Sequence, residues 1–304
     1  MNPPSEVDGR DRAISAGPAD RRRRGAFSLL GVAPFIGYLT LLLGVPAASV
    51  MVEAFRDNSG HLSLSNLSTI VDSNQPYLHD YVTSLELAAV SAAIAAAIGL
   101  VATVALVSSP SRTLRQLTTT AAGVLANTGG VPLAFAFIAS IGNSGVVTSF
   151  LTHLGFDPYD HGFSLASFAG LVVVYLYFLL PLTILLLLPP VEALRVEWRE
   201  AASTLGADAR TYWRKVGLPL LTPPLIATLM VLFMDAFAAY ATAEVLTTGT
   251  VPLVPLTIGS LLDGNVVANQ AHLGDALGFG MVVIVLAAGA LYVVVQRRTS
   301  KWLR

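Results

Sequence analysis

The chain contains no cysteine and few charged side chains. Charged residues make up 12% of its 304 residues and apolar residues 54%, whereas an ordinary soluble domain carries about 25% charged residues. The absence of cysteine excludes disulfides, thiolate metal ligands and cysteine nucleophiles. The net charge of −1 excludes little, because the distribution of charge along such a chain matters more than its sum.

Motifs for catalysis are also missing. The sequence has no P-loop lysine motif, and none of its five histidines stands in an H-E-x-x-H or other metal-ligand spacing. We therefore expect no catalytic residue, no metal site, no cofactor bound by this chain and no nucleic-acid partner. ATP hydrolysis would have to come from another chain.

The chain does contain six long apolar runs. They cover residues 27–51, 83–107, 118–141, 164–188, 219–241 and 276–296. Each run is about as long as the 20 apolar residues that cross a bilayer as a helix, and a helix satisfies its own backbone hydrogen bonds where lipid cannot. The sequence predicts an all-α integral membrane protein, with residues 27–304 forming one domain of six transmembrane helices.

The distribution of Lys and Arg predicts the orientation of these spans. All but one of the 18 basic residues fall in the N-terminal tail, the loops after the second and fourth spans, and the C-terminal tail. Only Arg56 lies on the other side. Because basic residues concentrate on the cytoplasmic side, we expect both termini in the cytoplasm. The opposite loops are acidic, either by default or because they attract a cationic solute or a basic partner.

The N-terminal segment 1–26 is rich in Pro, Gly, Ser, Asp and Arg. It has little to bury, and we expect a disordered, basic cytoplasmic tail. The apolar run after Arg21–Arg24 is longer than the apolar region of a signal peptide and ends at no clear cleavage site. We therefore expect a retained first span.

The loop 189–218 is the most basic loop of the chain. Pro189 and Pro190 are predicted to end the fourth span, because proline lacks an amide and clashes with the preceding turn. A helix is predicted over 192–205. Its apolar residues share one face: they are Leu194, Trp198, Ala201, Ala202 and Leu205.

Two residues predict how this helix ends and the next begins. Gly206 stands where a helix C-cap takes a left-handed residue. Asp208 can cap a second short helix over 208–216, after which Pro219 suits the first turn of the fifth span. Such an amphipathic, basic pair of helices can lie on anionic headgroups or insert into a groove on a soluble partner.

Residues 200–219 read EAASTLGADARTYWRKVGLP and contain the pattern E-A-A-x3-G-x9-V-x-L-P. The pattern and its place between the fourth and fifth spans resemble the EAA motif of permease subunits of binding-protein-dependent ABC importers, the MetI-like family. The resemblance implies a coupling helix and turn that dock on an ATPase. The residues implied in this coupling are Glu200, Ala201, Ala202, Leu205, Gly206, Val216, Leu218 and Pro219.

The resemblance also implies the function and the partners. The chain would be a non-catalytic permease subunit in the bacterial cytoplasmic membrane, forming the solute path. Its partners would be two ATP-binding subunits that hold ATP and Mg²⁺, a second permease that is identical or a sister chain, and an extracytoplasmic substrate-binding protein. The stretch from Thr204 to Ala207 resembles permeases for polyamines, phosphonates, iron, sulfate or molybdate more than sugar permeases. Residues 254–270 and 276–285 are most similar to permeases for polyamines and aminoalkylphosphonates, which implies an amine or phosphonate solute.

Asp235 lies in the middle of the fifth span, where a carboxylate normally faces the bundle interior or a cavity. Ala239 and Thr242 follow at i+4 and i+7, so one helical face is small and polar. We consider Asp235, Tyr240 and Glu244 candidates for the translocation path. A packing role or a proton relay at Asp235 is the alternative, and the latter would make the chain an ion-coupled secondary transporter. A membrane-embedded enzyme or scaffold is a third class.

Overall fold

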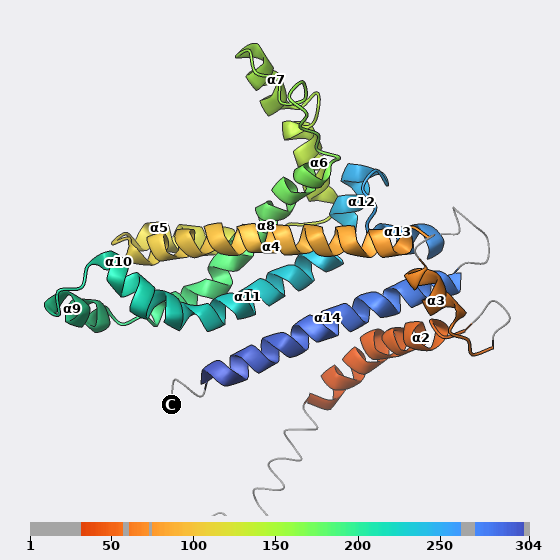
Figure 1. Cartoon of the computed structure of the whole chain (residues 1–304). Helices are drawn as coiled ribbons and strands as arrows, with labels where there is room; N and C mark the ends of the chain where they lie inside the picture. Colours follow the sequence, from red (N-terminus) through yellow and green to blue (C-terminus); the bar gives the residue numbers. More distant parts are fainter. Residues whose placement is uncertain (1–31, 57–60, 73–74, 263–270, 301–304) are drawn as a thin grey trace, which may run out of the picture. The chain divides into compact units, whose positions relative to one another are not determined.

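The computed structural model describes residues 32–56, 61–72, 75–262 and 271–300. The predicted tail 1–26 lies outside the described residues. Within these ranges the chain is helical, and its one β-bridge joins Arg56 and Leu62. In chain order the helices are η1 (Thr40–Gly44), α2 (Val45–Glu53), α3 (Ser65–Val71), α4 (Tyr77–Ser108), α5 (Arg112–Leu125), α6 (Val131–Ile141), α7 (Val146–His153), α8 (Phe168–Glu192), α9 (Val196–Thr204), α10 (Ala209–Tyr212), η2 (Trp213–Gly217), α11 (Leu218–Ala238), α12 (Ala241–Thr247), α13 (Val254–Leu262) and α14 (Ala271–Ser300) (Figure 1).

Six helical stretches in the described residues are long and apolar enough to cross a membrane. They are Val32–Glu53, Tyr77–Ser108, Val131–His153, Phe168–Glu192, Ala209–Ala238 and His272–Arg297. The prediction of an all-α protein with six spans is therefore confirmed. The chain divides into two compact units, Met1–Val52 and Glu53–Arg304. All further features lie in the second unit unless stated otherwise.

The two π-turns of the described chain have the same relation to proline. η1 of the first unit ends two residues before Pro46, and η2 ends two residues before Pro219. In each turn the residue just before the proline donates its N–H to the carbonyl five residues back. Proline clashes with the carbonyl four residues back, and the wider π-turn lets the helix continue through it.

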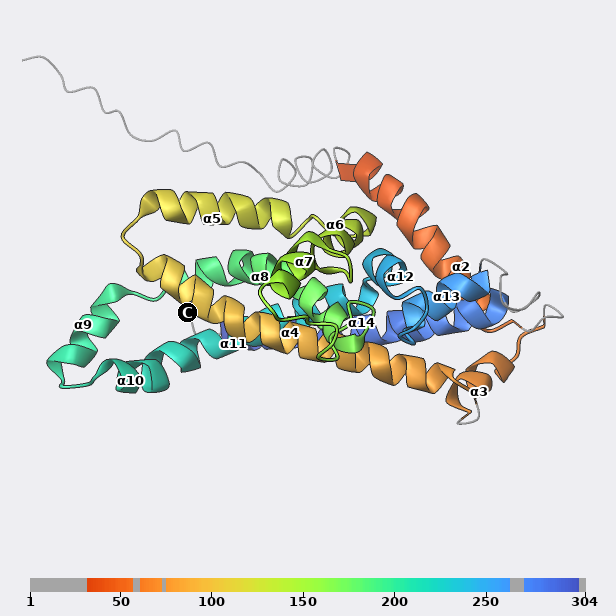
Figure 2. The same ribbon diagram turned by 90° about the horizontal axis from the view of Figure 1, so that it is seen from above.

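The core of the second unit forms where α4 packs against α8 and α11. Figures 1 and 2 show α4 as a long helix beside both of them. The buried residues of α4 include several small ones: Ala88, Ala92, Ala95, Ala96 and Gly99. Small residues let helix backbones approach closely in a membrane. At Gly99 an added Cβ would lie 2.4 Å from Cγ2 of Thr183 on α8.

The third span differs from the prediction of 118–141. The helix breaks after Leu125, Gly130 adopts φ +73°, and the membrane-length stretch runs over Val131–His153. Arg112, Arg115 and a threonine run keep α5 polar, so α5 is a separate amphipathic helix. Gly130, directly before α6, adopts its positive φ because glycine does so without strain.

The second span begins earlier than predicted, at Tyr77. Asp80, expected in an outer loop, therefore lies in the first turn of α4 and is buried. Its Oδ2 accepts a hydrogen bond of 2.6 Å from the hydroxyl of Thr257 on α13. Ser84, one turn further, accepts the N–H of Val254 at 2.9 Å. Two polar side chains of α4 thus hold the start of α13.

The close approach at Gly99 gives a test of this packing. We expect Gly99→Ala to destabilise the protein by about 1–3 kcal/mol, because the added methyl group overpacks the contact with Thr183. Gly123→Ala on α5 is the matched control, since an added Cβ there meets nothing within 4 Å. Thermal unfolding in detergent measures both. Equal unfolding temperatures for the two variants would contradict the close packing of α4 on α8.

Candidate functional site

Two features are candidates for function. One is the α9 hairpin, formed by α9, the turn at Gly206 and α10, and the other is a cavity at Asp235. The hairpin begins at the end of α8. Pro189 and Pro190 do not end this helix as predicted, since α8 continues to Glu192 with both prolines inside it. A proline loses only the bond to the carbonyl four residues before it, so the residues after it can remain helical, and the N–H of Ala193 bonds the Pro189 carbonyl at 3.0 Å. Glu192 forms an ion pair with Arg115 of α5.

The helix α9 is shorter than predicted and begins at Val196 after a turn. Its end matches the prediction at Gly206, which adopts φ +78°. The N–H of Gly206 bonds the Ser203 carbonyl and the N–H of Ala207 bonds the Ala202 carbonyl, each at 2.9 Å. These two bonds form a Schellman motif, which satisfies the last carbonyls of the helix. The chain therefore reverses sharply at Gly206.

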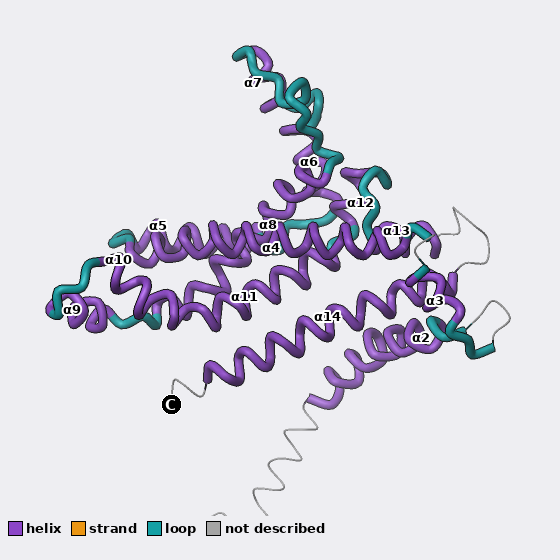
Figure 3. The backbone as a smooth tube through the Cα atoms, viewed as in Figure 1, coloured by secondary structure: helices purple, strands orange, loops and turns teal. Residues whose placement is uncertain are grey.

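Asp208 caps the next helix as predicted. Its Oδ1 accepts the N–H of Thr211 at 2.9 Å. The hydrogen bonds from Thr211 hold the pKa of Asp208 below its ordinary value. The helix does not end at Val216, however. The segments α10, η2 and α11 form one unbroken helix from Ala209 to Ala238 (Figure 3). Pro219 lies in the first turn of α11, as predicted, but helix also precedes it.

Gly217 is a residue that the sequence pattern leaves unspecified. It lies in the π-turn, and an added Cβ would come within 2.5 Å of the indole ring of Trp213. The ring therefore packs directly on the backbone of this turn. Val216 is half-buried, and Leu218 and Pro219 are exposed at the start of α11. No sequence signal distinguished Gly217 from the chain's other glycines.

The surface of α9 is uncovered in this chain. Glu200, Ala201 and Gly206 are exposed, Ala202 is half-buried, and the side chain of Leu205 is 87% exposed. Figure 1 shows α9 at the far end of the unit from α13, next to α10. An exposed apolar face rimmed by charges is typical of a docking surface. The structure thus brings the E-A-A-x3-G residues together on one projecting turn.

The second feature is a cavity of about 310 Å³. It lies where α5, α6, α8, α11 and α12 meet, and its lining includes Asn127, Gly130, Phe178, Asp235, Tyr240 and Thr242. Asp235 is exposed to this space. In the part of the chain that the structure describes, no basic side chain forms an ion pair with Asp235.

The backbone around the cavity corrects one prediction. Helix α11 ends at Ala238 and Ala239 is extended, so Asp235, Ala239 and Thr242 do not share one helical face. The break nevertheless places all three on the cavity wall. Glu244 lies on α12, exposed and outside the lining.

Hydrogen bonds hold this break in place. The Thr242 hydroxyl accepts the N–H of Gly130 at 2.9 Å, which joins α12 to the start of α6. The buried Tyr175 of α8 donates its hydroxyl to the Ala239 carbonyl at 3.1 Å. Three separate helices thus meet at the end of α11.

Comparisons with known proteins agree with this arrangement. The model of a family described as "Binding-protein-dependent transport system inner membrane component" matches residues 147–304. The chain is 26% identical over 167 residues to a "Probable sulfate transport system permease protein cysT" of Anthoceros angustus, covering 54% of this chain and 57% of that protein. It is 28% identical over 154 residues to the "Trehalose/maltose transport system permease protein MalF" of Thermococcus litoralis, covering 50% and 52%. The chain thus spans about half the length of the curated relatives it matches.

Two solved structures share the fold. One is a bacterial ABC transporter involved in the import of the acidic polysaccharide alginate, with a TM-score of 0.72 and 15% identity. The other is the bacterial alginate ABC transporter in complex with an alginate pentasaccharide-bound periplasmic protein, with a TM-score of 0.73 and 16% identity. Each match covers 93% of this chain and 98% of the matched chain. At this identity the likeness is one of fold alone.

Proposed function

The chain belongs to the family of binding-protein-dependent transport system inner membrane components, and we propose that it is the permease subunit of an ABC importer. In this proposal the chain forms the solute path and is not itself a catalyst. Separate subunits bind ATP and Mg²⁺ and hydrolyse the nucleotide. A second permease, identical or a sister chain, and an extracytoplasmic binding protein complete the complex, in a bacterial cytoplasmic membrane with both termini of this chain in the cytoplasm.

One observation supports this proposal above the others: a single helix connects the exposed turn to the cavity. It runs 30 residues from Ala209 to Ala238, or about 45 Å at 1.5 Å per residue. It begins directly after Gly206 and Asp208 and ends beside Asp235 and Ala239. A rigid helix of this kind carries a displacement at one end to the other. Movement of α9 by an ATPase would therefore move the wall of the cavity.

A second connection runs through α8. The ion pair between Glu192 and Arg115 joins the end of α8 to the start of α5, and α5 leads to the cavity at Asn127 and Gly130. α9 is therefore linked to the same cavity on both sides. One link runs through the end of α8 and α5, and the other through the helix that starts with α10. We propose Glu200, Ala201, Ala202, Leu205 and Gly206 as the docking surface, with Val216, Leu218 and Pro219 in the link to α11.

The cavity is the proposed translocation path, with Asp235 and Tyr240 on its wall and Glu244 further along α12. A carboxylate with no ion-pair partner in the described chain favours a solute with positive charge or hydroxyl groups over an anion. We keep an amine solute such as a polyamine, or a related aminoalkylphosphonate, as the proposal for the substrate. The similar proteins named above give it no support, since their names refer to sulfate, trehalose or maltose, and alginate.

The docking role of α9 can be tested by co-purification. We expect Glu200→Ala combined with Gly206→Val to reduce the bound ATPase at least about fivefold, because docking helices concentrate their binding energy in a few residues. Glu197→Ala is the matched control, since Glu197 is exposed on the same helix and outside the motif. Quantitative mass spectrometry of the complex purified from its native membrane measures the ratio. An ATPase retained equally by all three proteins would refute the docking surface.

The role of Asp235 can be tested in the reconstituted complex. We expect Asp235→Asn to reduce uptake of labelled spermidine about tenfold without loss of the bound ATPase, because removing a charged hydrogen-bonding group costs ~1.5–3 kcal/mol. Glu244→Gln, outside the cavity lining, should have a smaller effect. No spermidine uptake by the intact complex would exclude the polyamine substrate. Uptake that follows an ion gradient without ATP would instead support the secondary transporter.

A further inference from the structure

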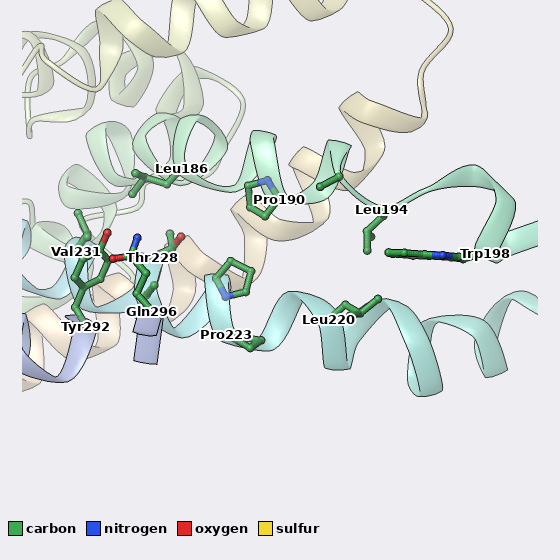
Figure 4. Close-up of a pocket in the computed structure, with 13 residues that line it drawn as sticks. Leu186, Pro190, Leu194, Trp198, Leu220, Pro223, Thr228, Val231, Tyr292 and Gln296 are labelled. Atoms are coloured by element: carbon green, nitrogen blue, oxygen red, sulfur yellow. The ribbon is translucent and has the colours of Figure 1, made fainter. Parts of the chain in front are cut away.

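A second cavity in the described residues is larger than the one at Asp235. A groove of about 390 Å³ lies between the end of α8, the first half of α11 and the end of α14, with the start of α9 along one side. Figure 4 shows Pro190, Leu194 and Trp198 on one wall and Leu220 and Pro223 on the other. None of the predicted coupling or path residues lines it.

The groove belongs to the membrane zone. Ten of its 13 lining residues lie in the membrane-length stretches of α8, α11 and α14, and the other three are Ala193, Leu194 and Trp198. The lining on α11 extends from Leu220 to Val231, which is about 16 Å along the helix axis. One leaflet of the hydrocarbon core has the same thickness, since the whole core is about 30 Å. The length of the groove along α11 therefore matches the thickness of one leaflet of the hydrocarbon core.

Its lining has the composition of a site for an acyl chain. Leucine, proline, alanine and valine make most of the wall, and the polar groups are limited to Thr228, Tyr292, Gln296 and the indole of Trp198. Tyrosine and tryptophan prefer the boundary between the hydrocarbon and the headgroups. A segment of a soluble protein in this groove would place backbone N–H and C=O groups in the hydrocarbon zone, where they lack hydrogen-bond partners. An acyl chain has no such groups.

The charges bordering the groove indicate the headgroup. Residues 195–215 carry five basic against three acidic residues. Of the three acidic residues, Glu197 pairs with Arg195, with 3.6 Å between Oε2 and Nε, and Asp208 caps α10. Exposed basic residues lie near the lining residues in the sequence of each element: Arg199 comes directly after Trp198, Lys215 lies five residues before Leu220, and Arg297 comes directly after Gln296. Basic residues at a membrane surface favour anionic lipids by about 1 kcal/mol each.

We propose that this groove binds one anionic phospholipid from the leaflet on the α9 side. An acyl chain lies between α8 and α11, and the phosphate lies beside the basic residues of α9, η2 and α14. Trp198 of α9 covers the acyl chain, so the lipid fills the space between α9 and the spans. The site does not depend on the identity of the transported solute or on the docking partner of α9.

Native mass spectrometry of the full chain in its complex, released from nanodiscs containing equal phosphatidylglycerol and phosphatidylcholine, tests the site. We expect one retained phosphatidylglycerol and a preference of about fivefold over phosphatidylcholine. Ala227→Phe fills the groove and should reduce retention at least about fivefold. Ala105→Phe is the matched control, because Ala105 is exposed on α4 outside the lining.

A second variant separates lipid binding from folding. Lys215→Gln combined with Arg199→Gln leaves the lining unchanged and should abolish the preference for phosphatidylglycerol while the chain stays assembled. Equal retention by Ala227→Phe and Ala105→Phe would overturn the site, and equal retention of both lipids by the unaltered protein would overturn the anionic headgroup. More bound lipid after deletion of residues 301–304 would show that this segment occupies the groove, which also overturns the proposal.

Discussion

The structure depends on one helix that stays continuous although it contains three prolines, which ordinarily break a helix. From Ala209 to Ala238 the backbone passes Pro219, Pro223 and Pro224 and remains helical. In lipid a broken helix leaves backbone groups without partners, each at a cost of several kcal/mol. The π-turn before Pro219 relieves the clash, since the N–H of Leu218 bonds the carbonyl of Trp213 five residues back, and the indole of Trp213 packs on the backbone of the turn at Gly217. Without this turn, the α9 hairpin and the cavity would lie on separate elements.

The same constraint explains the arrangement of polar groups inside the second unit. Asp80 and Ser84 of α4 hold the start of α13, and Thr242 and Tyr175 hold the backbone break after α11. Each polar side chain satisfies a backbone or hydroxyl group that lipid could not satisfy. Asp235 differs, since it lies on the cavity wall and forms no ion pair with a basic side chain of the described chain. For this reason we propose Asp235 for the solute path and the other side chains as the support of that path.

Much of this could be predicted from the sequence because it depends on composition and local chemistry. Six apolar runs predict six spans, a glycine after an apolar helix predicts the turn at Gly206, and Asp208 predicts its own cap. The errors came from residues whose effect depends on context. Pro189 and Pro190 disturb the turn before them, but the residues after them remain helical to Glu192. Ala239 gave no sign that α11 would end before it. The cavity at Asp235 and the groove at Trp198 each require several helices to meet, which no local pattern specifies.

The most direct test of the account is a cross-link from α9 to the ATPase. The chain has no cysteine, so one introduced cysteine is unique. Ser203 is exposed on α9 and Ser65 is exposed on α3, and each can be changed to cysteine with little change in shape. The account predicts that Ser203→Cys forms a cross-link to the ATPase subunit in the assembled complex and that Ser65→Cys forms none. Equal cross-linking from both positions, or from neither, would contradict the assignment of α9 as the coupling helix.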